Sequence, residues 1–418
     1  MRKILLILIL PIQLVFGQNE TSLDSCYNWA RHNYPNLKKS GSWSNITSLN
    51  KENLKTNYYP KVTLSGQASY QSDVIEVDIP MPGVTNPTVP KDQYKIYADL
   101  RQTIWDGGIS EASLQLEEAL LKSNLSELEV ELYQLNEQVA QTFFTALIVK
   151  EQLNVLTEQK KVLSEKLKLV ESAIKNGVLE KSSGLVIKAE ILNIEQRELE
   201  LDAVRNATYK MLSILTGKPD VQNTKLIYNK PQANFTEIIN RPEIQFFNSK
   251  TDELEMSKNV LSKTRNPKFF GFGQAGYGKP GLNVLNESFD TYLLIGAGIS
   301  WNAFDWKNTT RKKQIIEYNQ EIIQFQKETF TQNIQLLLAQ QKEQILKIEK
   351  MLDKDHEMVS LRTEITKAAA SKLENEVITA SDYIQEMQNE TIAKLSYELH
   401  KIQLSNAKEK YNIISGRE

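Results

Sequence analysis

Apolar residues recur at three- and four-residue steps through a long segment that begins near residue 110. The stripe consists of Leu114, Leu121, Leu125, Leu128, Leu132, Leu135, Val139 and Phe143. This spacing places the apolar side chains on one face of a helix and is typical of coiled coils. Segments 110–175 and 308–370 are also rich in strong helix formers. We therefore expect very long helices, with about 65 residues spanning on the order of 100 Å.

The placement of proline agrees with this expectation. Segments 91–218 and 281–418 contain none of the 12 prolines. A proline inside a helix costs about 3 kcal/mol, so both segments permit long uninterrupted helices.

A second pattern, with a period of two residues, predicts β-strands. In segment 60–71, apolar or small residues at even positions alternate with polar residues at odd positions, and segment 94–105 repeats the alternation. Each strand of about twelve residues is long enough for a tilted membrane-spanning strand, which needs about nine to eleven. The four prolines between the strands, within 80–90, indicate an irregular loop.

Both patterns return in the second half of the chain. Segment 267–278 shares six residues with segment 60–71 at an offset of 207 residues, and the partner strand 292–304 follows 94–105 at an offset of 199. The sequence Val178-Leu179 with Ser182 corresponds to Val377-Ile378 with Ser381, again at 199 residues. An internal duplication of this kind is strong evidence about architecture.

These patterns predict a domain organisation with two structural repeats. The first repeat, 18–218, has a strand hairpin at about 60–106 between helices 20–57 and 109–216. The second repeat, 237–413, has a hairpin at about 267–305 between helices 237–264 and 308–413. The remaining segments are a signal peptide (1–17), an inter-repeat linker (219–236) and a C-terminal tail (414–418).

The N-terminal segment is typical of a secretory signal peptide. Arg2 and Lys3 precede the apolar stretch 4–16, and Gly17 is a small residue suited to cleavage. A short anchor helix is the alternative, but Pro11 and Gln13 interrupt a stretch that is already too short to span a bilayer. We therefore expect an exported protein.

Composition and charge exclude several classes of function. The net charge of −2 gives no electrostatic basis for nucleic-acid binding. Cys26 is the single cysteine, so no intrachain disulfide forms, and we expect a free, packed thiol. The histidines at 32, 356 and 400 show no metal-ligand spacing, and the glycines at 271–278 lie on a strand with no following P-loop lysine. We expect no enzyme activity, cofactor or metal.

Four strands cannot close a barrel, and an open sheet edge in lipid leaves backbone groups unsatisfied. Three copies would supply twelve strands, an even number within the usual range of outer-membrane barrels. The predicted fold is therefore mostly α-helical, with four strands per chain completing a 12-stranded trimeric β-barrel that continues as a helical barrel. The expected lipid-facing positions are Ile96, Ala98, Leu100, Ile295, Ala297 and Ile299, and the expected lumen-facing positions are Lys61, Gln67, Asp99, Arg101 and Gln274.

Several motifs resemble those of one family. Each hairpin opens with Pro-Lys after a helix, and the first closes with the turn 104–108, Ile-Trp-Asp-Gly-Gly. The first repeat ends with 212–217, Leu-Ser-Ile-Leu-Thr-Gly, and the second begins with 241–244, Arg-Pro-Glu-Ile. In their order and spacing, over about 20–413, these motifs resemble the TolC family of outer-membrane efflux proteins.

The resemblance implies a homotrimer in the outer membrane of a Gram-negative bacterium, with a periplasmic helical tunnel. It also implies docking to a periplasmic adaptor protein and an inner-membrane transporter of the RND, ABC or MFS class, in an efflux pump or a type I secretion system. Asp382 matches an acidic position at the family's periplasmic entrance, where three copies would favour cations and raise one another's pKa. The alternative for Asp382 is a solvated acid that caps a helix.

The chain departs from the family pattern in the second repeat. Glu376 replaces the glycine that the first repeat keeps at Gly177, and Gln385 stands where some members have a second acid. Asp305-Trp306-Lys307 lacks the double glycine of the first hairpin exit. A structural or adhesive coiled-coil surface protein is the alternative function, although a coiled-coil stalk needs no duplicated hairpin.

Overall fold

The computed structural model describes residues 20–75, 83, 89–219, 221, 224–228, 232–233, 235 and 238–417. The expected signal peptide and part of the expected linker lie outside the described residues. The chain divides into two compact units. The helical unit comprises Met1–Leu37, Leu128–Pro242 and Thr329–Glu418, and the sheet unit comprises Lys38–Glu127 and Glu243–Glu328. None of the helices described has both the length and the apolar character needed to cross a membrane.

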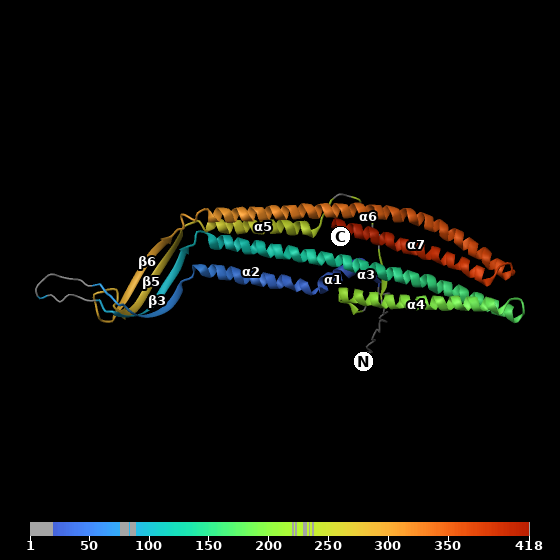
Figure 1. Cartoon of the computed structure of the whole chain (residues 1–418), viewed down its shortest axis with the longest axis horizontal. Helices are drawn as coiled ribbons and strands as arrows, with labels where there is room; N and C mark the ends of the chain where they lie inside the picture. The colour runs from blue at the N-terminus through green and yellow to red at the C-terminus, as the bar shows by residue number, and fades with distance from the viewer. Residues whose placement is uncertain are drawn as a thin grey trace, which may run out of the picture. The chain divides into compact units, whose positions relative to one another are not determined.

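Four long helices make the chain mostly helical, as the sequence predicted (Figure 1). Helices α3 (Ile109–Lys175) and α6 (Asn308–Glu374) have 67 residues each. Helices α4 (Lys181–Thr216) and α7 (Ala380–Ser415) have 36 residues each. The first and last residues of α6 and α7 lie 199 positions after those of α3 and α4, respectively. Within the helical unit, ion pairs join α3 to α4 and α6 to α7.

The sheet unit contains a four-stranded antiparallel sheet. Its strands are β2 (Lys61–Tyr70), β3 (Asp92–Trp105), β5 (Lys268–Lys279) and β6 (Asp290–Ser300), in the order β2-β3-β5-β6. Strand β6 ends at Ser300, earlier than the expected Phe304, because its partner β5 begins at Lys268 opposite Ser300. The residue before Lys268 is Pro267, which has no N–H to extend the ladder.

The segment expected as one helix over 20–57 consists of several elements. Strand β1 (Glu20–Ser22) precedes α1 (Leu23–Asn33), and the short helix η1 (Pro35–Lys38) separates α1 from α2 (Lys39–Lys55), which the short helix η2 (Thr56–Tyr58) follows. Tyr34 is extended, with ψ 122°, because a residue before proline is disfavoured in the helical conformation. Strand β1 pairs in parallel with β4 (Lys225–Ile227), a small sheet that the sequence pattern did not indicate.

Helix α1 belongs to the main core of the helical unit. Cys26, at 0% exposure, packs in one cluster with Phe143 and Phe144 of α3 and Leu212 of α4. Burial raises the pKa of the Cys26 thiol to about 12. The predicted free and packed thiol is thereby confirmed.

Asp106 stabilises the turn between β3 and α3 through hydrogen bonds to its carboxylate. Its carboxylate accepts hydrogen bonds from the backbone N–H of Ser110 at 2.7 Å and of Gly108 at 3.0 Å, and from the Tyr58 hydroxyl at 2.8 Å. These bonds satisfy donors at the start of α3 that lack helical partners. Asp305 does the same for α6, accepting from Thr309 N–H at 2.9 Å and from Arg265 at 3.2 Å.

The two repeats share unusual backbone conformations. Gly107, Gly108 and Gly177 have positive φ angles of 81°, 84° and 77°. The residues 199 positions later, Trp306, Lys307 and Glu376, also have positive φ angles, of 53°, 62° and 59°. A side chain in this region costs about 1–2 kcal/mol. The second repeat therefore retains the backbone path of the first even where it has lost the glycines that favour it.

The turns at the ends of α3 and α6 are matching Schellman motifs. Gly177 N–H donates to Ile174 O at 3.0 Å and Val178 N–H to Ala173 O at 2.9 Å. In the second repeat, Glu376 N–H donates to Leu373 O at 3.1 Å and Val377 N–H to Lys372 O at 2.8 Å. Residues 177 and 376 are the left-handed positions of this motif, which explains why glycine suits both.

We expect Asp106→Ala to lower the free energy of unfolding by about 1–2 kcal/mol, because it removes the cap of α3. Burial raises the pKa of Asp106, but hydrogen bonds from Ser110, Tyr58 and Gly108 outweigh this and hold it below 3.8. The contribution is therefore complete above pH 3.8 and is lost as pH falls through the folded-state pKa. Urea unfolding of the detergent-solubilised protein between pH 2 and 7 measures both effects. Asp106→Asn, which retains an acceptor, should lose the pH dependence but less of the stability.

We expect Glu376→Gly to stabilise the protein by about 1 kcal/mol, because glycine adopts the left-handed conformation without strain. The thermal midpoint of the helical signal measures the change. Glu364→Gly is the control, since Glu364 is exposed in the interior of α6, where the same substitution should destabilise by about 1 kcal/mol. A lower midpoint for Glu376→Gly would contradict the assignment of strain to this position.

Candidate channel wall and entrance

Strand register brings the six expected lipid-facing residues to one face of the sheet. Leu100 lies opposite Gly273, which lies opposite Ile295, and Ala98, Ala275 and Leu293 form the next row. Opposed residues in antiparallel strands point to the same side. Large apolar side chains of this face are exposed in the single chain: Val62 69%, Leu64 74%, Ile96 54%, Leu100 42%, Leu293 64%, Ile295 75% and Ile299 60%. A continuous apolar surface of this kind must be shielded from water by another apolar surface.

The five expected lumen-facing residues share the other face. Lys61 lies opposite Arg101, Gln67 opposite Lys95, and Asp99 lies between Thr63 and Gln274. The Gln274 amide donates a hydrogen bond to Asp99 at 3.4 Å. This hydrogen bond joins polar side chains of β3 and β5 on the polar face.

The polar face also carries aromatic rings that the sequence reasoning did not assign to it. Phe270 lies opposite Gly298 and Phe272 opposite Gly296, and a Cβ atom at either glycine would overlap the facing ring. The Arg101 guanidinium lies 4.5 Å from the centre of the Phe270 ring. The same even-odd alternation that placed Gln274 could have placed Phe270 and Phe272.

Asp382, the expected entrance residue, lies in the first turn of α7, where Thr379 is the N-terminal cap. The Asp382 N–H donates to Thr379 Oγ1 at 3.2 Å, and Thr379 donates to the Asp382 carboxylate through its N–H at 2.9 Å and its hydroxyl at 2.7 Å. This is a capping box. The hydrogen bonds from Thr379 lower the pKa of the exposed Asp382, so the carboxylate is charged at neutral pH. The geometry accounts for Asp382 as a capping acid, and a role in the entrance stays a prediction.

A second polar group near these turns joins three helices. Lys166 of α3, with 8% of its side chain exposed, forms an ion pair with Glu374 of α6 at 2.7 Å. Its ammonium also lies 5.6 Å from the ring centre of Tyr383 in α7. The Lys166 ammonium lowers the pKa of Glu374. Sequence reasoning missed this group, although a lysine between the core residues Leu163 and Val170 is a signal for a buried polar contact.

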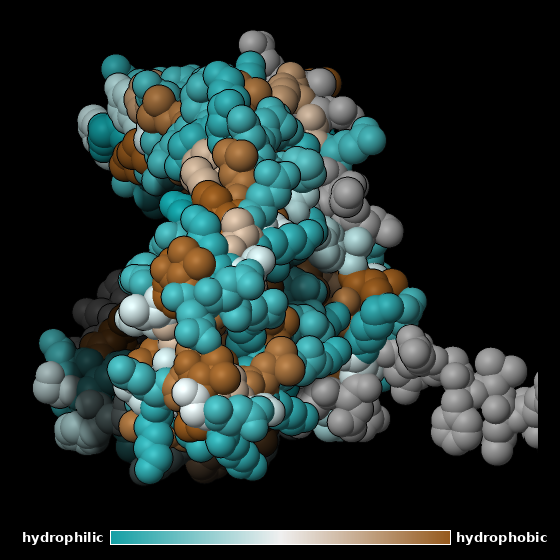
Figure 2. Space-filling model, turned by 90° about the vertical axis from the view of Figure 1, so that its right-hand side faces the viewer, coloured by the Kyte–Doolittle hydropathy of each residue, from teal (hydrophilic) through white to brown (hydrophobic). Residues whose placement is uncertain are grey.

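Figure 2 shows a face of the molecule on which apolar side chains are scattered among polar ones. Val178 is 52% exposed and Val377 is 67% exposed, at equivalent positions of the two turns. Within the part of the chain that the structure describes, no three His, Cys, Asp or Glu side chains are grouped to hold a metal ion.

Comparison with known proteins supports the picture of a channel wall. Residues 52–218 match the family described as outer membrane efflux protein. A search of curated protein sequences found no significant match. The matched family is one of efflux proteins.

Solved structures share the fold over nearly the whole chain. The outer membrane protein VceC of Vibrio cholerae is 13% identical, with a TM-score of 0.67, and the match covers 94% of this chain and 96% of VceC. The CmeC outer membrane channel of Campylobacter jejuni is 15% identical, with a TM-score of 0.64 and coverage of 94% and 85%. The MtrE outer membrane channel of Neisseria gonorrhoeae, in its open state, is 13% identical, with a TM-score of 0.64 and coverage of 94% and 88%.

The family match covers the first hairpin and the first pair of long helices, and the structural matches extend the same fold through the second repeat. Residues 52–218 thus match the family of outer membrane efflux proteins, and the chain as a whole has the fold of the outer-membrane channels VceC, CmeC and MtrE.

Proposed function

We propose that three copies of this chain form the exit duct of a tripartite efflux pump or a type I secretion system. The observation that carries the proposal is the four-stranded sheet, which exposes one apolar face and leaves β2 and β6 with free edges. Lipid covers an apolar face, but unpaired backbone groups at a sheet edge cost several kcal/mol each in lipid. Three sheets joined edge to edge into a 12-stranded barrel satisfy both requirements.

The helices supply the periplasmic part of the proposed duct. In the sheet unit, β2 and β5 begin and β3 and β6 end at the same edge of the sheet, because the strands are antiparallel. Each of these four strand ends connects to a helix, so the four adjoining helices leave the sheet at the same edge. The long helices of three copies then form a helical barrel in the periplasm of a Gram-negative bacterium.

The proposed partners are those that a match to the efflux family implies. A periplasmic adaptor protein docks on the helical barrel and links it to an inner-membrane transporter of the RND, ABC or MFS class. The duct itself conducts passively. The repeat boundaries 18–218 and 237–413, with the linker 219–236, belong to the same proposal. They receive support from the bounds of α3 and α6, displaced by 199 residues.

We expect the purified protein to be a trimer that gives discrete single-channel conductance in planar bilayers. Ile295→Arg places a charge on the proposed lipid face and should cost about 2–4 kcal/mol, abolishing assembly in the membrane. Leu294→Arg is the matched control, because Leu294 lies opposite Gln274 on the polar face and should preserve both the trimer and conductance. A monomer without conductance, or equal loss in both variants, would contradict the duct.

A ring of three Asp382 carboxylates is proposed as a cation filter at the periplasmic entrance. Asp382→Asn removes the charge while its side chain still caps α7, so cation selectivity should fall with little change in stability. Ser183→Asp, at the equivalent position of the first repeat, should raise selectivity by adding a second acidic ring. Reversal potentials under a salt gradient measure both, and an unchanged value for Asp382→Asn would exclude the filter.

A further inference from the structure

Exposed aromatic side chains gather at the edge of the sheet where the helices adjoin it. Trp105, Phe269 and Ile299 lie in one row across β3, β5 and β6, on the face of the sheet proposed to meet lipid. Trp301 follows Ile299 by two residues and is 62% exposed, and its indole N–H donates to the Arg265 carbonyl at 3.0 Å. In a membrane barrel, aromatic rings at such an edge lie at the boundary between hydrocarbon and headgroups.

The opposite end of the same face carries a second group of aromatic rings. Tyr277 lies opposite Ile96, and the Phe289 ring stacks on those of Tyr277 and Tyr94, with ring centres 5.4 Å and 6.2 Å away. At about 3.3 Å per residue and a strand tilt of about 40°, Tyr94 and Trp105 of β3 are about 28 Å apart along the barrel axis. Membrane barrels have an apolar band of about 25 Å between two aromatic girdles, so the two groups fit the two headgroup boundaries.

The turn from β6 into α6 presents two more rings to solvent. Phe304 is 78% exposed and Trp306 is 81% exposed, and their ring centres are 5.8 Å apart. Trp306 and Lys307 adopt left-handed backbone conformations, at the positions where the first repeat has Gly107 and Gly108. The turn therefore carries an aromatic ring and a cation where glycine would suit the backbone better.

Basic side chains surround these rings. Lys307 lines a cleft of about 390 Å³ together with Phe304 and Trp306, and the Arg311 guanidinium donates to the Trp306 carbonyl at 3.0 Å. Lys312 is exposed on the next position of α6. Within the described part of the chain, no carboxylate forms an ion pair with any of these three cations.

The start of α6 also differs in charge from the starts of the other long helices. It has no acidic residue in its first turn, whereas α3 and α7 have Glu111 and Asp382 there. Positive charge at the N-terminus of a helix opposes the helix dipole, so an anion bound beside these cations would be favoured. The equivalent positions of the first repeat hold Ala112 and Ser113, so this charge belongs to the second repeat alone.

We propose that the turn from β6 into α6 binds the headgroup of an anionic phospholipid in the periplasmic leaflet of the membrane. The proposal rests on the proposed duct for the position of the sheet in the membrane. The lipid phosphate pairs with Lys307, Arg311 and Lys312, while the rings of Phe304 and Trp306 contact the glycerol and the upper acyl chains. Sheets joined edge to edge leave this face uncovered, and the apolar surface continues from the rings onto the sheet. This continuity favours a lipid over a free anion.

Native mass spectrometry of the full detergent-solubilised protein with phosphatidylglycerol tests the site, with phosphatidylcholine of the same acyl chains as the neutral reference. We expect phosphatidylglycerol to bind more tightly, and its affinity to fall about thirtyfold when Arg311→Gln and Lys312→Gln are combined. Lys347→Gln combined with Lys350→Gln is the matched control. Both lysines are exposed on α6 within the helical unit, so the same change of charge should leave the affinity unaltered.

Trp306→Gly separates lipid binding from folding. Glycine adopts the left-handed conformation of this position without strain, so the thermal midpoint should stay the same or rise. Loss of the ring should nevertheless weaken phosphatidylglycerol binding roughly tenfold.

Three outcomes would overturn the site: equal affinity for the two lipids, unchanged affinity in the Arg311 and Lys312 variant, or complete displacement of the lipid by inorganic phosphate. Conductance of the same preparations in planar bilayers is measured separately. A conducting trimer that binds no phosphatidylglycerol removes the site and leaves the duct. A monomer without conductance that still prefers phosphatidylglycerol contradicts the duct and supports the site.

Discussion

Backbone hydrogen bonding in lipid is the constraint on which the rest of this structure depends. Water satisfies the free edge of a sheet at the surface of a soluble protein, but hydrocarbon cannot. The sheet here carries large apolar side chains such as Leu64 and Ile295 on one face, and its outer strands β2 and β6 have free edges. The proposed association of several copies would pair these edges, so the proposal rests on the chemistry of the peptide group.

The same constraint governs the connections between strands and helices. Asp106 and Asp305 each satisfy the first backbone donors of a helix of 67 residues, which explains why an acid follows the last aromatic residue of each hairpin. Trp306, Lys307 and Glu376 keep positive φ angles without the glycines of the first repeat. The two repeats therefore differ more in their side chains than in their backbone path. The reason is that the geometry of each turn sets the direction of the long helix beside it.

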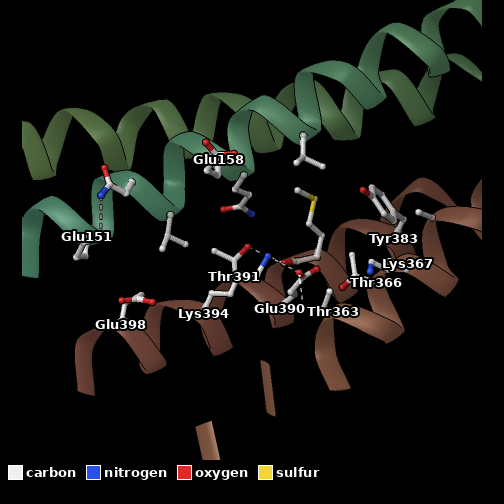
Figure 3. Close-up of a pocket in the computed structure, with 16 residues that line it drawn as sticks. Glu151, Glu158, Thr363, Thr366, Lys367, Tyr383, Glu390, Thr391, Lys394 and Glu398 are labelled. Carbon is white, nitrogen blue, oxygen red and sulfur yellow. Dashed lines mark hydrogen bonds and ion pairs between the residues drawn. The ribbon is translucent and has the colours of Figure 1, made fainter. Parts of the chain in front are cut away.

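In the helical unit, polar groups mark the places where helices of the two repeats meet. Lys166 joins Glu374 and the Tyr383 ring across α3, α6 and α7. A neighbouring cleft between the same three helices is lined by Glu158 and Gln159 (Figure 3). A buried polar group is costly unless it is paired, so such positions are where a ligand or a partner alters the balance between packed helices most strongly.

The sequence by itself determined the periodic features of this protein. Two-residue alternation placed Ile96, Leu100 and Ile295 on one sheet face, and the offset of 199 residues anticipated the equal lengths of α3 and α6. Periodicity is a local property of the chain, so the order of apolar and polar residues is enough to reveal it.

Only the tertiary structure decided which residues from distant segments meet. Several features depend on contacts or backbone angles that the spacing of residues does not encode. They are the break at Tyr34, the β1–β4 pairing, the capping geometry of Asp382, the Lys166–Glu374 pair and the cleft lined by Gln159. Such contacts arise where the faces of separate helices and strands pack, and their partners can be far apart in the sequence, as Lys166 and Glu374 are at 208 residues.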